Sequence, residues 1–230
     1  MTSGNKYRIF LLATMALILS SKGIAGPSGL LQSDYIVRQP VENGFAIAHE
    51  GVIVPLWISD KDFPGVLRVA GHLCSDLEKV TGTAPVLHTG TDTPPCPRMI
   101  VAGTIGKHEL IDKLAAKGII PGKWLEGKKD TYIAAVVREP AEGIREILVI
   151  AGSDKRGTIY GLYDLSRQSG VTPLHFWADV PVRPAEELYA LPGVFSPGEP
   201  AVKYRGLFIN DEAPALAGWV HERYGSFNSR

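Results

Sequence analysis

Hydrophobic residues recur at helical spacing in one long stretch of the chain. Between residues 66 and 80 the apolar positions lie three or four residues apart: Val66, Leu67, Ala70, Leu73, Cys74, Leu77 and Val80. This spacing places side chains on one face of a helix. Asp62 followed by Pro64 is a helix-start signal, and Gly82 ends the element. Two further patterns predict helices at about 108–117 and 158–169.

Short apolar runs of β-type composition lie between the predicted helices. They predict strands at 45–48, 52–58, 85–87, 99–102, 132–137 and 147–151. The first two are separated by 49–51 only, which predicts a hairpin. Because strands alternate with helices on this scale, the pattern predicts an α/β domain over residues 30–185.

The pattern changes after this domain. Residues 181–200 contain five prolines, a composition typical of a connector, which we place at 186–200. Residues 202–209 then predict a strand, and a helix follows from Pro214 to about Tyr224. One strand and one helix cannot bury their apolar faces alone. The strand therefore either joins the preceding sheet or, as the prolines favour, begins a truncated (β/α)₈ barrel at 201–230, since a whole barrel needs about 250 residues.

The first residues predict export. Lys6 and Arg8 precede an apolar run at 9–19, and Gly23-Ile24-Ala25 offers small residues for cleavage after Ala25. This layout predicts a signal peptide at 1–25 and a secreted or periplasmic protein. The alternative is a membrane anchor, but the run is shorter than the roughly 20 apolar residues that cross a bilayer.

Charge and cysteine content narrow the function classes. Loss of the leader leaves 21 basic side chains against 24 acidic ones, so the balance predicts neither a nucleic-acid nor a membrane partner. Cys74 and Cys96 could form a disulfide in an oxidising compartment, yet Cys74 lies on the apolar face of a helix and also fits as a small hydrophobe. The histidines are scattered, and no metal-ligand spacing is present.

Two loops between a strand and a helix suggest phosphate binding but lack its motifs. Residues 103–107 lack the P-loop spacing, and residues 151–157 lack the G-x-G-x-x-G pattern. Lys155 and Arg156 near a helix N-terminus could hold an anion. A capped turn with solvated charges is the favoured interpretation.

Three polar residues directly after the strand at 202–209 are the strongest candidates for chemistry. Asn210, Asp211 and Glu212 stand where a barrel strand presents catalytic or binding side chains, and paired carboxylates are typical of glycoside hydrolysis. On spacing alone, a carboxylate that caps the following helix is an equal alternative. Trp177 is the aromatic residue that we select as a candidate sugar contact.

Three blocks of the sequence resemble glycoside hydrolase family 115, the xylan α-1,2-glucuronidases. They are residues 151–166 (AGSDKRGTIYGLYDLS), 176–182 (FWADVPV) and 203–219 (KYRGLFINDEAPALAGW). The resemblance implies an N-terminal α/β accessory domain, a (β/α)₈ barrel and further domains. It also implies inverting removal of glucuronic acid, or its 4-O-methyl form, from xylan or glucuronoxylan oligosaccharides, with no cofactor.

The resemblance also implies roles for individual residues. Asn210, Asp211 and Glu212 come to the end of the first barrel strand, where Asp211 contacts substrate or water. The main acid and base are implied to lie beyond this chain, far enough apart to admit a water. One departure is Arg167, where the family pattern suggests glutamate; if that position helps to form the pocket, Arg167 becomes a candidate uronate contact.

Three hypotheses remain open. The first is the front part of an exported α-glucuronidase, inactive by itself. The second is a stand-alone carbohydrate-binding module, and the third is a non-functional truncated product.

Overall fold

The computed structural model describes residues 34–206, 208 and 216–225, except for the side chain of Trp177. The chain divides into two compact units, residues 1–199 and 200–230. Within the described ranges, no helix combines the length and the hydrophobicity that crossing a membrane requires.

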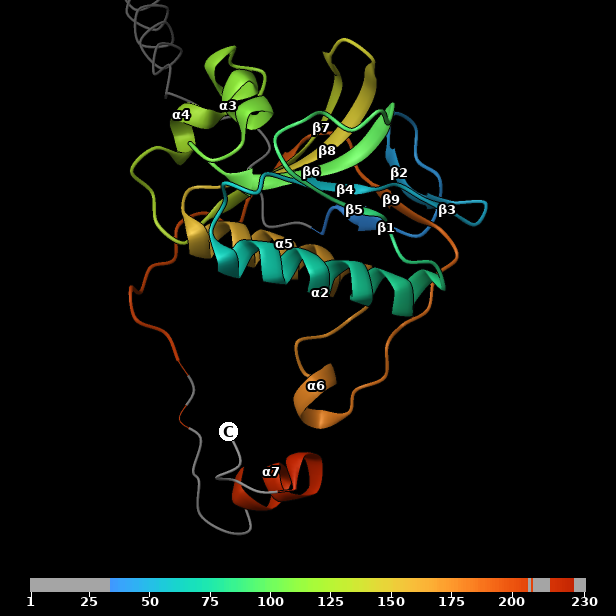
Figure 1. Ribbon diagram of the computed structural model, residues 1–230, viewed down its shortest axis with the longest axis vertical. Coiled ribbons are helices and arrows are strands. Elements are labelled where there is room, and N and C mark those ends of the chain that lie inside the picture. Colours follow the sequence, from blue (N-terminus) through green and yellow to red (C-terminus); the bar gives the residue numbers. More distant parts are fainter. Residues whose placement is uncertain (1–33, 207, 209–215, 226–230) are drawn as a thin grey trace, which may run out of the picture. The chain divides into compact units, whose positions relative to one another are not determined.

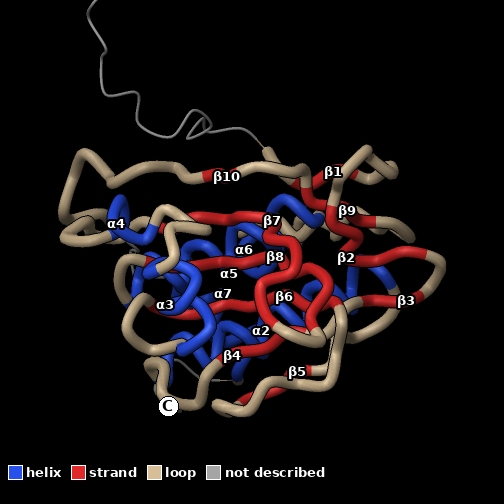
Figure 2. The backbone as a smooth tube through the Cα atoms, turned by 90° about the horizontal axis from the view of Figure 1, so that it is seen from above, coloured by secondary structure: helices blue, strands red, loops and turns tan. Residues whose placement is uncertain are grey.

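The first unit is built on a six-stranded sheet. Its strands follow one another in the order β10–β7–β8–β6–β4–β5 (Figure 2). Their bounds are β4 Leu56–Ile58, β5 Leu87–Thr89, β6 Arg98–Thr104, β7 Tyr132–Ala141, β8 Ile144–Gly152 and β10 Val194–Phe195. The four strands from β8 to β5 run parallel, whereas β7 forms an antiparallel hairpin with β8 and pairs with β10. Strands β6 and β8 are almost continuously apolar because both faces of the sheet are covered.

Helices cover both faces of this sheet (Figure 1). The long helices α2 (Pro64–Thr81) and α5 (Lys155–Ser169) pack on one face, and the shorter α3 (Glu109–Ala116) and α4 (Gly122–Leu125) pack on the other. Because side chains alternate along a strand, Ile100 of β6 faces the first pair and Val101 faces the second. The sheet therefore has two separate apolar cores.

Helix α5 lies unusually close to the sheet. A Cβ added at Gly157 would be 2.0 Å from the carbonyl oxygen of Thr131, and one at Gly161 would be 2.6 Å from Ile150 Cγ2. Only glycine permits this approach of helix and strand backbones.

A smaller antiparallel sheet lies beside the larger one. Its strands are β1 (Ile36–Val37), β9 (Leu188–Ala190), β2 (Phe45–His49) and β3 (Val52–Ile53), paired in that order. Strands β1 and β9 join segments that lie far apart in the sequence. A short helix, α6 (His175–Ala178), precedes β9.

The mixed α/β class and the β2–β3 hairpin are confirmed, with corrections. The run 52–58 is two strands, β3 and β4, which belong to different sheets and are separated by Val54 and Pro55. Strand β5 begins at Leu87, two residues later than predicted, and α5 begins at Lys155, three residues earlier. The stretch 186–200, predicted as a connector, contains β9 and β10.

The second unit contains helix α7 (Leu216–Tyr224). Residues 201–206 and 208 are not in a strand, so the prediction of a strand at 202–209 is wrong over its described part. The side chains of Val202, Tyr204 and Phe208 are exposed, so they do not pack in a core as those of a buried barrel strand would. No closed barrel is formed by the described residues of this unit.

Candidate functional site

The sequence-predicted site residues are only partly within the described structure. Asn210, Asp211 and Glu212 lie outside the described residues, so their predicted roles stay predictions. Trp177 belongs to helix α6, but its side chain is outside the description. Arg167 is the predicted contact whose side chain lies within the described structure.

The guanidinium group of Arg167 lies between two carboxylates. Its Nε and NH2 atoms donate to Asp164 Oδ1 at 3.0 and 2.9 Å, and NH2 also donates to Asp34 Oδ1 at 3.1 Å. The Arg167 side chain is 44% exposed. Both partners belong to the same unit, and they tie α5 to the segment that precedes β1.

The second oxygen of Asp164 continues this connection. Asp164 Oδ2 accepts hydrogen bonds from Tyr132 OH at 2.7 Å and from Gln168 Nε2 at 2.6 Å. Gln168 Oε1 in turn accepts from the backbone N–H groups of Tyr35 at 2.7 Å and Ile36 at 3.1 Å. Burial, followed by the charge of Asp164, raises the pKa of both tyrosines, so both are neutral, and the Tyr132 hydroxyl is the one that donates to Asp164. In this structure Arg167 belongs to a network that attaches β1 to α5.

A second polar network lies at the carboxyl ends of the parallel strands. Asp62, in the turn between β4 and α2, accepts hydrogen bonds from Thr104 N at 2.7 Å, Thr104 Oγ1 at 2.9 Å and Phe63 N at 2.7 Å. The hydroxyl of Thr104 also lies 2.8 Å from that of Thr158 on α5. All three polar side chains are buried. Asp62 therefore joins the turn after β4 to the end of β6, and Thr104 extends this connection to α5. The residue that caps α2, Phe63, makes no side-chain hydrogen bond.

His108 lies at the same edge, in an apolar setting. Its ring is 1% exposed and packs edge-on against Trp57, with centroids 4.5 Å apart. Neither ring nitrogen has a hydrogen-bond partner. Burial lowers the pKa of His108 to about 4, against the opposing charges of Asp62 and Glu109. The imidazole is thus neutral at physiological pH.

The carboxyl edge is an attractive place for a ligand, because open parallel sheets bind ligands there. Here, however, both oxygens of Asp62 are occupied by internal donors. Its arrangement with Thr104 and Thr158 fits a structural role better than acid–base chemistry.

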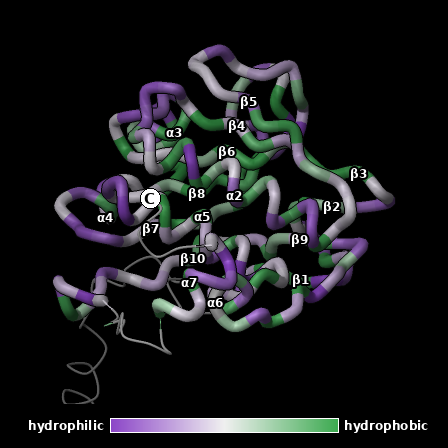
Figure 3. Tube along the Cα trace, turned by 60° about the horizontal axis from the view of Figure 1, so that its bottom comes forward, coloured by the Kyte–Doolittle hydropathy of each residue, from purple (hydrophilic) through white to green (hydrophobic). Residues whose placement is uncertain are grey.

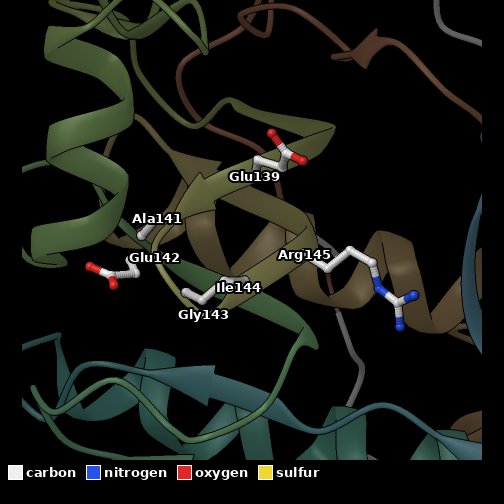
Figure 4. A pocket seen from close by; sticks show the side chains of 6 residues that line it. All are labelled: Glu139, Ala141, Glu142, Gly143, Ile144 and Arg145. Atoms are coloured by element: carbon white, nitrogen blue, oxygen red, sulfur yellow. The ribbon is translucent and has the colours of Figure 1, made fainter.

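Two hollows on the described surface do not gather reactive groups. One hollow lies at the tip of the β7–β8 hairpin, where the side chains of Glu139, Glu142 and Arg145 point in different directions (Figure 4). A second lies at the end of α2, lined by residues 79–82 and 184–186. In neither hollow do two carboxylates face each other across a space for a sugar.

Cys74 and Cys96 are free, so the disulfide is not formed. Cys74 packs against the core, and burial raises the pKa of its thiol to about 11, as expected of a small hydrophobe. Among the described residues, no three His, Cys, Asp or Glu side chains are grouped as metal ligands would be.

Comparison with known proteins places the chain in a family. Its structure is similar to that of BtGH115A, a family GH115 4-O-methyl-α-glucuronidase with specificity for decorated arabinogalactans. The two are 34% identical, with a TM-score of 0.60, over 78% of this chain and 22% of BtGH115A. Residues 197–230 match the profile of glycosyl hydrolase family 115. The chain belongs to glycosyl hydrolase family 115. This confirms the resemblance carried by the three sequence blocks.

Two family 20 enzymes are more distant. The β-N-acetylhexosaminidase of Streptomyces coelicolor A3(2) is 17% identical with a TM-score of 0.47, over 87% of this chain and 33% of that one. The chitobiase of Flavobacterium johnsoniae is 14% identical with a TM-score of 0.43, over 78% and 22%. At these identities and TM-scores, we conclude nothing about this chain from either enzyme. No curated protein matches the chain. The chain spans about a fifth of BtGH115A, so activity does not follow from the likeness alone.

Sequence reasoning missed the buried polar residues. Asp62 is interpreted as a helix-start signal, and nothing in its spacing indicates Thr104 or Thr158 as partners. His108 stands at the predicted start of α3 with no local sign of burial. A strand end followed by a polar residue in two neighbouring parallel strands was the available signal for the Asp62–Thr104 contact.

Proposed function

We propose that this chain is the N-terminal part of an exported α-glucuronidase, which removes glucuronic acid or 4-O-methylglucuronic acid from polysaccharide side chains. The observation that carries the proposal is the likeness to BtGH115A at 34% identity, together with the family 115 match at 197–230. Reaction with inversion needs a general acid and a general base far enough apart for a water molecule.

The substrate is proposed to be glucuronoxylan, as the sequence blocks imply. A specific observation favours a second candidate, because BtGH115A is described as specific for decorated arabinogalactans. The two polymers share the uronic acid and differ in the backbone that carries it. Specificity for the backbone is therefore the finer part of the proposal.

Catalytic roles are proposed for the residues that follow position 209. Asp211 contacts the sugar or the attacking water, Asn210 binds substrate, and Glu212 is a second carboxylate at the same place. The main acid and base are proposed to come from later strands of a (β/α)₈ barrel. Residues 26–230 alone therefore release no uronic acid.

The experiment uses the complete reading frame that contains this chain, expressed without residues 1–25. Uronic acid released from 4-O-methylglucuronoxylan and from glucuronidated arabinogalactan is measured by anion-exchange chromatography. The proposal predicts release from glucuronoxylan and a fall in kcat/KM of about 100-fold or more for Asp211→Asn. The matched control is Asp92→Asn, which changes an exposed loop carboxylate. Release from neither polymer would contradict the proposal.

The same protein and polymers distinguish the two other hypotheses, a stand-alone carbohydrate-binding module and a non-functional truncated product. A reading frame that ends after Arg230, with saturable binding of glucuronoxylan oligosaccharides and no release, would favour the module. Absence of both binding and release would favour the third hypothesis.

A further inference from the structure

The segment between α3 and β7 carries a concentration of positive charge. Residues 113–129 contain five lysines and one glutamate, in a chain whose formal net charge is zero. This segment includes the short helix α4, around which the backbone is coloured mainly as hydrophilic in Figure 3.

Most of these lysines have no acidic partner. Lys113 pairs with Glu109 at 2.6 Å. For Lys117, Lys123, Lys128 and Lys129, in contrast, no ion pair with any carboxylate of the described residues is formed. Lys117 ends α3, where a positive charge stabilises the helix dipole. The other three lysines do not follow the end of a long helix.

An aromatic ring lies among these charges. Trp124 of α4 is partly buried against the core, and Lys128 Nζ lies 4.8 Å from the centre of its ring. Ile119, in the preceding turn, is 47% exposed. The segment thus combines cationic groups with apolar surface.

The segment is also held in place. Ile120 and Leu125 are buried, and Gly122 contacts Ala115 of α3 so closely that an added Cβ would be 2.3 Å from the Ala115 Cβ. At its end, Lys129 N donates to Glu199 Oε1 at 3.1 Å. The lysine side chains therefore project from a fixed backbone, which reduces the entropy lost on binding.

We propose that Lys117, Lys123, Lys128, Lys129 and Trp124, called here the lysine surface, bind the acidic polysaccharide. A uronic acid is anionic at neutral pH, since carboxyl groups titrate near pH 4. Its carboxylate suits the lysines, and the C–H faces of sugar rings pack on an aromatic ring. This inference rests on the proposed function, from which the acidic polymer is taken.

The ion pairs between these lysines and the uronic acid carboxylates would form at the protein surface, in contact with water. Each exposed ion pair contributes a factor of up to about five in affinity, and salt screens the attraction beyond about 10 Å at 0.1 M. Binding is thus weak, additive along the polymer, and sensitive to ionic strength. A nucleic acid or an anionic membrane offers negative charge as well, and each is included in the test.

The test measures binding of the full chain to 4-O-methylglucuronoxylan by affinity electrophoresis and isothermal calorimetry at low salt. The variant is the triple substitution Lys123→Gln, Lys128→Gln and Lys129→Gln. The matched control removes the same charge elsewhere, with Lys61→Gln, Arg68→Gln and Arg145→Gln, all at exposed side chains. Thermal unfolding verifies that both variants fold.

The inference predicts that the triple variant binds glucuronoxylan about tenfold more weakly, that the control does not, and that 0.5 M salt removes the difference. Binding to uncharged arabinoxylan is the same in all three proteins. Equal glucuronoxylan affinity in the triple variant and the control would overturn the inference. So would wild-type binding to DNA or phosphatidylserine vesicles as tight as binding to glucuronoxylan.

Failure of this inference and failure of the proposed function give different results. If the complete protein releases uronic acid and the triple variant binds normally, the lysine surface is wrong and the enzyme stands. If binding depends on the lysines but no uronic acid is released, the proposed enzyme is wrong and the surface stands.

Discussion

The two helical layers of the first unit, which cover opposite faces of one sheet, differ in length and in how closely they pack on it. Helices α2 and α5 form a long, closely packed layer, in which Gly157 brings α5 onto Thr131 and a buried network joins Asp62, Thr104 and Thr158. Helices α3 and α4 are short, and the segment from the end of α3 to β7 carries the exposed Lys117, Lys123 and Lys129.

This difference indicates which layer stabilises the fold and which layer leaves surface for polar contacts. The α2 and α5 layer depends on close glycine contacts and on the buried hydrogen bonds of Asp62 and Thr104, where few substitutions fit. The α3 and α4 layer buries a small core and one neutral histidine, and leaves its outer side available for polar contacts. We therefore expect unfolding energies to be most sensitive to the first layer.

The largest effect is expected from Gly157→Ala. The added Cβ would overlap the Thr131 carbonyl oxygen, so α5 must move away from the sheet and lose packing. We expect the free energy of unfolding to fall by about 4 kcal/mol, measured by urea denaturation. The matched control is Gly71→Ala on α2, where nothing lies within 4 Å of an added Cβ. It should be neutral or stabilise by up to about 1 kcal/mol, and equal loss in both variants would contradict close packing of α5.

Asp62→Ala tests the buried network of the same layer. It leaves Thr104 N and the Thr104 hydroxyl without their acceptor in a buried place, which should cost about 3 kcal/mol. The exposed Asp60→Ala is the control and should change stability by less than about 0.5 kcal/mol. A loss from Asp62→Ala as small as that of the control would show that the network does not stabilise the fold.

On the other face, His108 predicts a dependence of stability on pH. Its pKa is lowered from 6.5 to about 4 when the chain folds, so between these values the unfolded chain binds a proton that the folded chain does not. Stability therefore rises with pH across this window, by about 3 kcal/mol at most. His108→Phe should remove this part of the slope, measured as the urea midpoint from pH 4 to 7. An unchanged slope would mean that His108 is charged when folded.

The smallest effect is expected from Arg167. Arg167→Glu replaces exposed ion pairs with Asp164 and Asp34 by repulsion, and should lower the free energy of unfolding by about 1 kcal/mol. The change should be smaller in high salt. Arg167→Gln is the comparison, since it removes the charge without reversing it. A gain in stability from the glutamate would contradict the network described for Arg167.

The parts predicted from sequence are those that depend on local periodicity. The apolar positions of α2 and the runs of β6 and β8 carry their own signal. Strands β1, β9 and β10 have two or three residues each and exist through pairing with distant segments, which no local pattern reveals. In the sequence, Asp62 followed by Pro64 is a helix-start signal. In the structure, Asp62 accepts a hydrogen bond from the distant Thr104, so its role is to join two segments of the fold.

For the candidate site, the sequence indicates the family but not the contacts of the individual residues. The family was evident from the three sequence blocks, because their order and spacing are specific. Arg167 was selected from a departure within one block, but its contacts with Asp164 and Asp34 depend on how the N-terminal segment folds back. The sequence does not predict helix α4, because four residues are too few to show a helical periodicity of apolar positions.

The most direct test of the central claim is a proton NMR time course of 4-O-methylglucuronoxylan with the complete protein. The account predicts that free 4-O-methylglucuronic acid appears, and that its β-anomer is seen first, because inversion of an α-linkage produces that form. Absence of any released uronic acid would contradict the assignment as an α-glucuronidase. Initial appearance of the α-anomer would contradict inversion.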